Sequence, residues 1–121
     1  MKKLPLKARA KKALYVGRQY VRLQHGKFLE HDCLRITFYE EAVKELGLNT
    51  NGKAKAKLSF FEDKGNYFIQ KDELGNLTPQ KINETTFTLP SIQLFKFMDV
   101  RAGDYELFKF EDKYMLKPIL L

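Results

Sequence analysis

The sequence has few of the residues on which many small proteins depend. Its 121 residues include one cysteine, Cys33, and no tryptophan. A single cysteine excludes an internal disulfide framework and a zinc site built from several thiolates, and it suits a reducing compartment. No apolar run approaches the roughly 20 residues of a membrane-spanning helix. The basic N-terminus also lacks the apolar stretch of a signal peptide, so we expect a cytoplasmic protein of a bacterium or of a phage-infected host cell.

The sequence also lacks the residue patterns of a catalytic or metal site. His25, His31 and Cys33 lie close together, but their spacing matches no metal-ligand signature, and ordinary turn and core positions are the better interpretation. No Ser-His-acid set, phosphate-cradling glycine loop or paired-carboxylate pocket is visible. We therefore expect a non-enzymatic protein with no metal and no cofactor.

Acidic side chains are absent before Glu30. The first 29 residues contain nine basic residues, whereas the rest of the chain contains 13 basic and 15 acidic residues. A net charge of +7 placed so unevenly usually indicates a polyanionic partner, nucleic acid first and an anionic membrane second. The alternative is a solubilising basic tail. We expect DNA as the partner, and no membrane.

Two stretches of the chain resemble each other. The tetrapeptide Phe-Glu-Asp-Lys occurs at 61–64 and at 110–113. Apolar residues and a turn glycine around it recur in the same order: residues 36–38 match 87–89, Val43 and Leu46 match Leu94 and Phe97, Gly52 matches Gly103, and residues 67–69 match 114–116. We interpret this correspondence as an internal duplication.

Each copy is predicted to fold as a strand, a short helix and a hairpin. Residues 34–38 alternate between apolar and polar, which is typical of a half-buried strand. Thr37 and Glu40 have the spacing of a capping box at the start of a helix that Gly47 can end. In the second copy, Pro90 suits the first helical turn.

Turn residues divide the chain further. Residues 63–66 predict a hairpin bend, His25-Gly26 predicts the turn of an upstream hairpin, and 74–76 suggest another hairpin in the connector. The expected segments of one compact domain are a basic N-terminal segment with a hairpin (1–33), a first unit (34–70), a connector (71–85) and a second unit (86–121).

The order of these elements resembles the AbrB-like (swapped-hairpin) family of DNA-binding proteins. The second copy has Phe-Thr-Leu-Pro at 87–90 for the strand-to-helix step and Ala-Gly-Asp at 102–104 for the turn. The first copy has Arg-Ile-Thr-Phe at 35–38, with Tyr39 where the family prefers proline and Lys53 after the turn glycine. Together the copies carry the resemblance over most of the chain, about residues 34–118.

The resemblance implies a mainly β fold with short helices, in which two strand–helix–hairpin repeats form a small β-barrel. Tandem copies, as in MraZ-type members, would pair within one chain, because one unit cannot bury its apolar surface alone. Pairing between two chains, as a homodimer, is the alternative. In the family a basic patch lies on the first strand; Arg35 matches its arginine, whereas the second copy has Thr86, so we expect an asymmetric patch. The alternative fold is a five-stranded barrel of the OB type.

Basic residues at strand spacing are the candidates for DNA contact. Lys53, Lys55 and Lys57 would place three ammonium groups on one strand face at about phosphate spacing, or would protect an edge strand from aggregation. Arg18, Tyr20 and Arg22 share another face in a region without acidic residues, which suits phosphate neutralisation and base stacking; a solvated face is the alternative. The full candidate set is Lys7, Arg9, Lys11, Lys12, Arg18, Tyr20, Arg22, Lys27, Arg35, Lys53, Lys55 and Lys57.

Three phenylalanines do not fit the alternating pattern of the core. Phe61, Phe108 and Phe110 occupy strand positions that cannot all face one core, so we expect some of them at a binding surface or in a dimer interface. The sequence thus predicts a DNA-binding protein, first a duplex-binding transcriptional regulator of AbrB-like type. One alternative is a single-stranded DNA-binding protein of a phage-like replication or recombination system. Another is a structural or partner-binding protein without nucleic acid, which a near-neutral surface after folding would favour.

Overall fold

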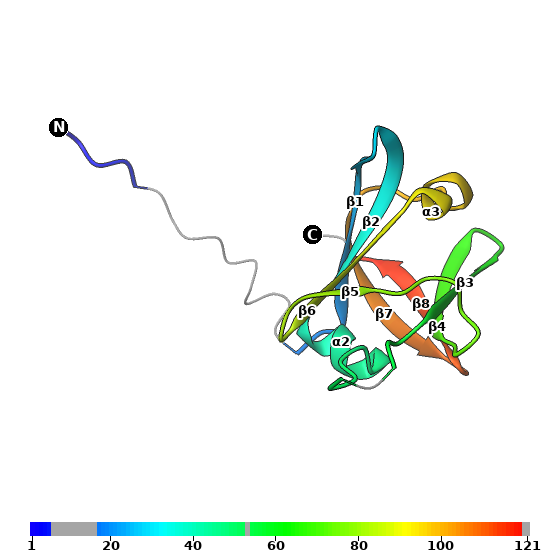
Figure 1. The fold of residues 1–121 in the computed structure, drawn as a ribbon. Helices are drawn as coiled ribbons and strands as arrows, with labels where there is room; N and C mark the ends of the chain where they lie inside the picture. The colour runs from blue at the N-terminus through cyan, green and yellow to red at the C-terminus, as the bar shows by residue number, and fades with distance from the viewer. Residues whose placement is uncertain (6–16, 53, 120–121) are drawn as a thin grey trace.

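A single curled antiparallel sheet forms the body of the protein. The computed structural model describes residues 1–5, 17–52 and 54–119. In the described residues the elements are β1 (Tyr20–Phe28), β2 (His31–Phe38), α2 (Glu40–Leu46), β3 (Leu58–Asp63), β4 (Asn66–Lys71), β5 (Gln80–Asn83), β6 (Thr86–Ser91), α3 (Ile92–Phe97), β7 (Gly103–Phe110) and β8 (Lys113–Pro118) (Figure 1). The strand order is β3-β4-β8-β7-β1-β2-β6-β5. The predicted mainly β, barrel-like fold is confirmed, with eight strands rather than the five of the alternative.

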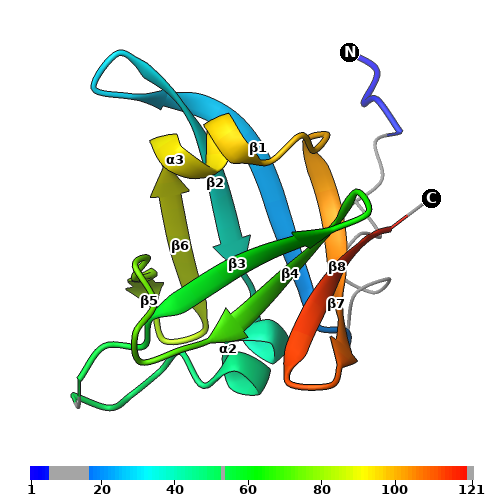
Figure 2. The ribbon, with the colours of Figure 1, turned by 90° about the vertical axis from the view of Figure 1, so that its right-hand side faces the viewer.

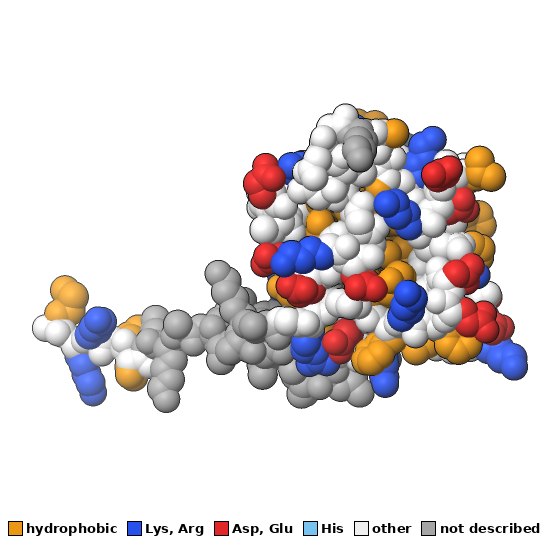
Figure 3. Space-filling model, turned by 90° about the horizontal axis from the view of Figure 1, so that it is seen from below, with side chains coloured by type: hydrophobic (Ala, Val, Ile, Leu, Met, Phe, Trp, Pro, Cys, Tyr) orange, Lys and Arg blue, Asp and Glu red, His pale blue; other side chains and the backbone are white. Residues whose placement is uncertain are grey.

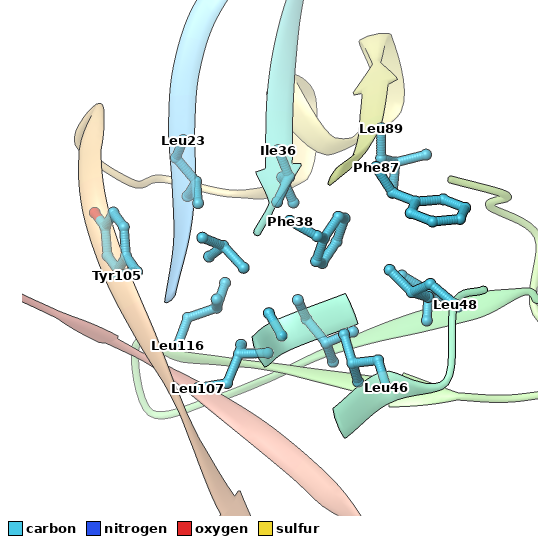
Figure 4. Close-up of a cluster of buried hydrophobic side chains, with 14 of the residues drawn as sticks. Leu23, Ile36, Phe38, Leu46, Leu48, Phe87, Leu89, Tyr105, Leu107 and Leu116 are labelled. Atoms are coloured by element: carbon cyan, nitrogen blue, oxygen red, sulfur yellow. The ribbon is translucent and has the colours of Figure 1, made fainter. Parts of the chain in front are cut away.

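The curl of the sheet gives the molecule two outer walls around one core. Figure 2 shows β3, β4 and β8 in front of β1, β2 and β6. Side chains at alternate positions point into the space between the walls, where Leu23, Ile36 and Phe38 are fully buried (Figure 4). Helix α2 adds Leu46 to the same cluster. The predicted alternation of residues 34–38 is therefore confirmed.

The helix ends differ from two sequence predictions. Gly47 has φ 61° after α2 and ends the helix as predicted. The capping box is wrong: Thr37 pairs with Arg22 on one side and Thr88 on the other, so strand pairing holds it inside β2, and Tyr39 precedes the helix without a side-chain cap.

Pro90 lies in β6 and not in the first turn of α3. The cap of α3 is Ser91, whose Oγ accepts a hydrogen bond from the Leu94 amide at 3.0 Å. Pro90 is paired with Arg35 of β2, but it lies beyond the pairing of β5 with β6, which reaches only to Thr88, so one side of the strand is open at the proline.

Two hairpin turns also lie elsewhere than predicted. The β1–β2 turn is formed by Leu29 and Glu30, both with positive φ, while Gly26 pairs with Cys33 inside the hairpin. The connector hairpin turns between β5 and β6, after Asn83, and not at 74–76. The predicted bend at 63–66 is confirmed, since Asp63 pairs with Asn66.

The two halves of the chain have the same order of elements and are interleaved. One half runs β1-β2-α2-β3-β4 and the other β5-β6-α3-β7-β8, and the hairpin β7–β8 lies between β4 and β1. At the β2–β6 seam, Thr37 faces Thr88; at the β4–β8 seam, Phe68 faces Met115. These are residues that match in the sequence comparison, so both seams have the register that an approximate twofold axis requires.

Two tyrosines that match in the sequence comparison also link the two halves in equivalent ways. The Tyr114 hydroxyl, in the second half, donates a hydrogen bond to Glu45 of α2, in the first half. The Tyr67 hydroxyl, in the first half, accepts a hydrogen bond from the Asp99 amide, just after α3 in the second half, at 2.9 Å. Each half therefore anchors the helix end of the other.

The repeated Phe-Glu-Asp-Lys is not structurally equivalent in the two halves. In the first copy its first three residues, 61–63, end β3, and Lys64 begins the turn. In the second copy Phe110 ends β7 and the turn is Glu111-Asp112, so Lys113 already belongs to β8. The tetrapeptide is two residues out of register, because the two β-turns begin at different positions within it.

Tyr114 gives the stability of the protein a pH dependence in alkaline solution. Burial raises the pKa of Tyr114 to about 12, and the hydrogen bond to Glu45 acts in the same direction. The unfolded chain has a tyrosine pKa near 10, so above about pH 10 the unfolded state loses a proton that the folded state keeps. We expect the free energy of unfolding to fall from about pH 10 to 12, and to fall less steeply in Tyr114→Phe. Urea unfolding of both proteins across this range tests it; equal slopes would contradict it.

Candidate nucleic-acid interface

Arg22 of β1 and Arg18, two residues before β1, are paired with acids from β7. Pairing of these strands places Tyr20 opposite Glu106 and Arg22 opposite Asp104. Arg22 Nε donates to Asp104 Oδ1 at 2.8 Å, and Arg18 Nε donates to Glu106 Oε1 at 3.1 Å. The prediction that this region lacks acidic partners is wrong, because the sheet brings the acids from 82 and 88 residues away. The hydrogen bond to Asp104 raises the pKa of Arg22 further, so its charge is permanent but compensated.

Tyr20 is also engaged within the fold. Its ring stacks on Tyr39, with ring centroids 4.4 Å apart, and the Arg22 guanidinium lies over the Tyr39 ring at 5.8 Å. Burial raises the pKa of Tyr20, with a smaller contribution from Tyr39. One face of Tyr20 is therefore covered. Tyr39 was missed by the sequence analysis, although its position directly after β2 and opposite the start of β1 is the signal that could have found it.

Arg35 is the cation of this wall that stays available. It is exposed in β2, between Gln24 of β1 and Pro90 of β6, and no acidic side chain pairs with it among the described residues. Lys27, nearer the hairpin tip, pairs with Asp32 at 2.6 Å. That pair is exposed, so it holds the lysine only weakly.

Lys55 and Lys57 lie in the loop before β3 rather than in a strand. Both are exposed, with Ala56 and Leu58 buried, so the predicted alternation holds over 55–58 without the strand, whereas Ala54 is exposed. They border a surface hollow together with Lys71. The same hollow contains Asp72 and Glu73, which reduces its positive character. Of the other candidates, Lys7, Arg9, Lys11, Lys12 and Lys53 lie outside the described residues.

The positive excess of the chain is concentrated at its N-terminus. Residues 17–119 contain 16 basic and 15 acidic residues, whereas residues 1–16 contain six basic and none acidic. Basic and acidic side chains are accordingly interspersed on the face of the folded part that Figure 3 shows. The folded part thus has the near-neutral balance that favours the alternative without nucleic acid. It contributes individual cations such as Arg35, and the long-range positive potential comes from the first 16 residues.

A row of apolar side chains crosses the opposite wall. Phe61 pairs with Phe68, Phe68 with Met115, and Met115 with Phe108, so one residue from each of β3, β4, β8 and β7 lies in line. Phe61 and Phe108 are 38% and 43% exposed, and Phe110 beside them is 59% exposed. The prediction that these three phenylalanines do not all face the core is confirmed. Phe68 and Met115 were missed; the bend predicted at 63–66 is the signal that could have placed Phe68 opposite Phe61.

Comparisons with known proteins identify no relative of this chain. No protein-family model, curated protein or solved structure matches this chain. In the parts of the chain that the structure describes, no cluster of His, Cys, Asp and Glu is placed to hold a metal ion. No helix of these parts is long and apolar enough to cross a membrane. The proposals below are therefore based on the geometry of this chain.

Proposed function

We propose that this chain is a non-enzymatic, cytoplasmic DNA-binding protein, a regulator in which two AbrB-like units interleave within one molecule. The observation that carries the proposal is the placement of charge. The six basic residues of 1–16 precede β1 in the sequence, and β1 is the neighbour of β2, on which Arg35 is exposed. A basic segment whose sequence contains no acidic residue, followed by a wall with an available arginine, suits a phosphate backbone.

The seams of the sheet support the AbrB-like arrangement. Matched residues face each other at Thr37–Thr88 and at Phe68–Met115, which is what two interleaved copies of one unit would produce. Duplex DNA is the preferred target because Tyr20, the aromatic residue of this wall, already stacks on Tyr39 and offers at most one face to a base. Phosphate contacts do not need a free ring.

A single-stranded target is the second candidate, because a specific observation favours it. The exposed row Phe61, Phe68, Met115 and Phe108 could stack unpaired bases, and Lys113 and Lys117 lie within reach of its rings. Such binding would use the wall opposite Arg35, which makes the two candidates separable by mutation.

The test is a titration with single- and double-stranded oligonucleotides of matched sequence, at several salt concentrations. We expect tighter binding to the duplex, with a steep loss of affinity as salt rises and a marked effect of Arg35→Gln. Tighter binding to the single strand, with a loss in Phe108→Ala and none in Arg35→Gln, would replace the first candidate by the second. Absence of binding to both would overturn the proposal.

Asp104 is expected to restrain DNA binding. Asp104→Asn removes the carboxylate that pairs with Arg22 and leaves the arginine charge uncompensated on the proposed DNA wall. We expect binding to tighten about 3- to 10-fold at low salt and the salt slope to steepen by up to about one unit. Fluorescence anisotropy with a labelled duplex measures both.

The matched control is Asp99→Asn, which changes the net charge equally at an exposed acid without an ion-pair partner among the described residues. Equal tightening in both variants would indicate a general effect of net charge and would contradict a role for the Arg22–Asp104 pair.

A further inference from the structure

We propose that the outer face of β3, β4, β8 and β7 binds a second copy of this chain, face against face. The proposed duplex contacts do not use this face, and self-association does not depend on them. The face is defined by the row Phe61, Phe68, Met115 and Phe108, together with Phe110 at the end of β7.

The row is ordered by the sheet. Each of its members is the cross-strand partner of the next, and Phe68 and Phe110 are in contact with ring centroids 5.9 Å apart. Single exposed apolar residues are normal on protein surfaces, but an aligned row on one sheet face is typical of a contact surface.

The position of the row favours self-association. Its centre is the Phe68–Met115 seam, where matched residues of the two halves meet, and Phe61 and Phe108 flank that seam one strand further out on each side. A local twofold axis at an antiparallel seam is perpendicular to the sheet. A second copy that is turned over and laid on this face can therefore align its row with the first in two orientations, which are related by a half-turn about that axis. An isologous dimer needs such a self-complementary surface.

The charges around the row point to the same partner. Lys113 Nζ lies over the Phe61 ring at 4.8 Å, and Lys117 Nζ lies over the Phe108 ring at 5.1 Å. Acids lie beside these lysines: Lys113 pairs with Asp112 at 3.1 Å, and Glu106, which also pairs with Arg18, is the cross-strand partner of Lys117. A rim with both signs repels a polyanion through its acids but can pair with a copy of itself.

The area of the face sets the expected strength. Four strands of about six residues measure roughly 20 Å by 20 Å, from ordinary strand spacing and rise. That is about 400 Å² on each copy, which is the size of a weak, transient interface, so we expect dissociation at high micromolar concentrations. The wall that carries Arg35 stays free in such a dimer, because the two walls lie on opposite sides of the core (Figure 2).

The test is sedimentation equilibrium of the full chain without DNA, from about 1 to 300 µM, a range that brackets a micromolar dissociation constant. We expect a monomer at the lowest concentrations and a dimer at the highest. Phe108→Glu is expected to weaken the dimer at least tenfold, since it places two new like charges in the row, and Phe110→Glu is a second variant with the same expectation. Circular dichroism confirms that each variant is folded.

The matched control is Phe97→Glu, because Phe97 is 78% exposed on α3 and lies outside the row. A dimer that Phe97→Glu weakens as much as Phe108→Glu does would overturn the proposal, as would a wild-type chain that stays monomeric throughout. Dissociation of the dimer by a single-stranded oligonucleotide, with oligonucleotide binding lost in Phe108→Ala, would assign the row to bases instead. Failure of DNA binding leaves this measurement unaffected.

Discussion

Replacing Lys7, Arg9, Lys11 and Lys12 together with glutamine is expected to weaken duplex binding about 100-fold at ~0.15 M salt. These residues supply four of the six positive charges in residues 1–16. No acidic residue occurs in the sequence before Glu30. Each lysine or arginine that contacts a phosphate contributes about 0.9 unit to the slope of log affinity against log salt, so the slope should fall by about three to four units. Anisotropy titrations at four salt concentrations give both quantities.

A control with the same net charge separates contact from general electrostatics. Lys64, Lys71, Arg101 and Lys109 are four basic residues of the folded part that have no ion-pair partner among the described residues, and none of them belongs to β1 or β2. Their replacement by glutamine should reduce affinity much less. If both quadruple variants lose affinity equally, the N-terminal residues act only through the net charge of the chain, and the proposed contact is wrong.

Phe38→Ala is expected to lower the free energy of unfolding by about 3–5 kcal/mol. Phe38 is completely buried and ends β2, where its cross-strand partners are Val21 in β1 and Phe87 in β6. Its removal opens a cavity beside the β2–β6 seam, so both halves of the molecule lose packing. Because the total free energy of unfolding of a domain of this size is about 5–15 kcal/mol, the variant should be partly unfolded in mild denaturant.

Phe108→Ala is the comparison, since it removes the same side chain from an exposed position. Urea unfolding at low protein concentration, where association does not contribute, should show a change within about 0.5 kcal/mol for this variant. Similar losses in the two variants would contradict the exposed position of Phe108.

Local rules predicted the elements that depend on neighbouring residues. The alternation of residues 34–38, the glycine that ends α2 and the bend at 63–66 each follow from a few adjacent side chains. The β1–β2 turn was missed because Leu29 and Glu30 adopt positive φ without a glycine. The cost of that conformation is offset by the long pairing of β1 with β2, which a local pattern does not contain.

The candidate site depended on contacts that no local pattern contains. Tyr20 and Arg22 share a face of β1 as predicted, whereas Arg18 lies before the strand, and the acidic partners of both arginines follow α3, more than 80 residues later in the chain. Only the register between β1 and β7 places Asp104 beside Arg22. For the same reason the row on the opposite wall was visible only as phenylalanines that did not fit, since its alignment is a property of four strands together.

Because both halves belong to a single polypeptide, the two ends of the molecule need not be identical. In a symmetric pair of identical chains every substitution appears twice, whereas here Arg35 on β2 can coexist with Thr86 at the matching place on β6. The two ends of the molecule are therefore chemically distinct, and only one of them is joined to the basic N-terminus. A protein of this kind would sit on an extended target in one orientation, and an asymmetric site would suit it better than a palindrome.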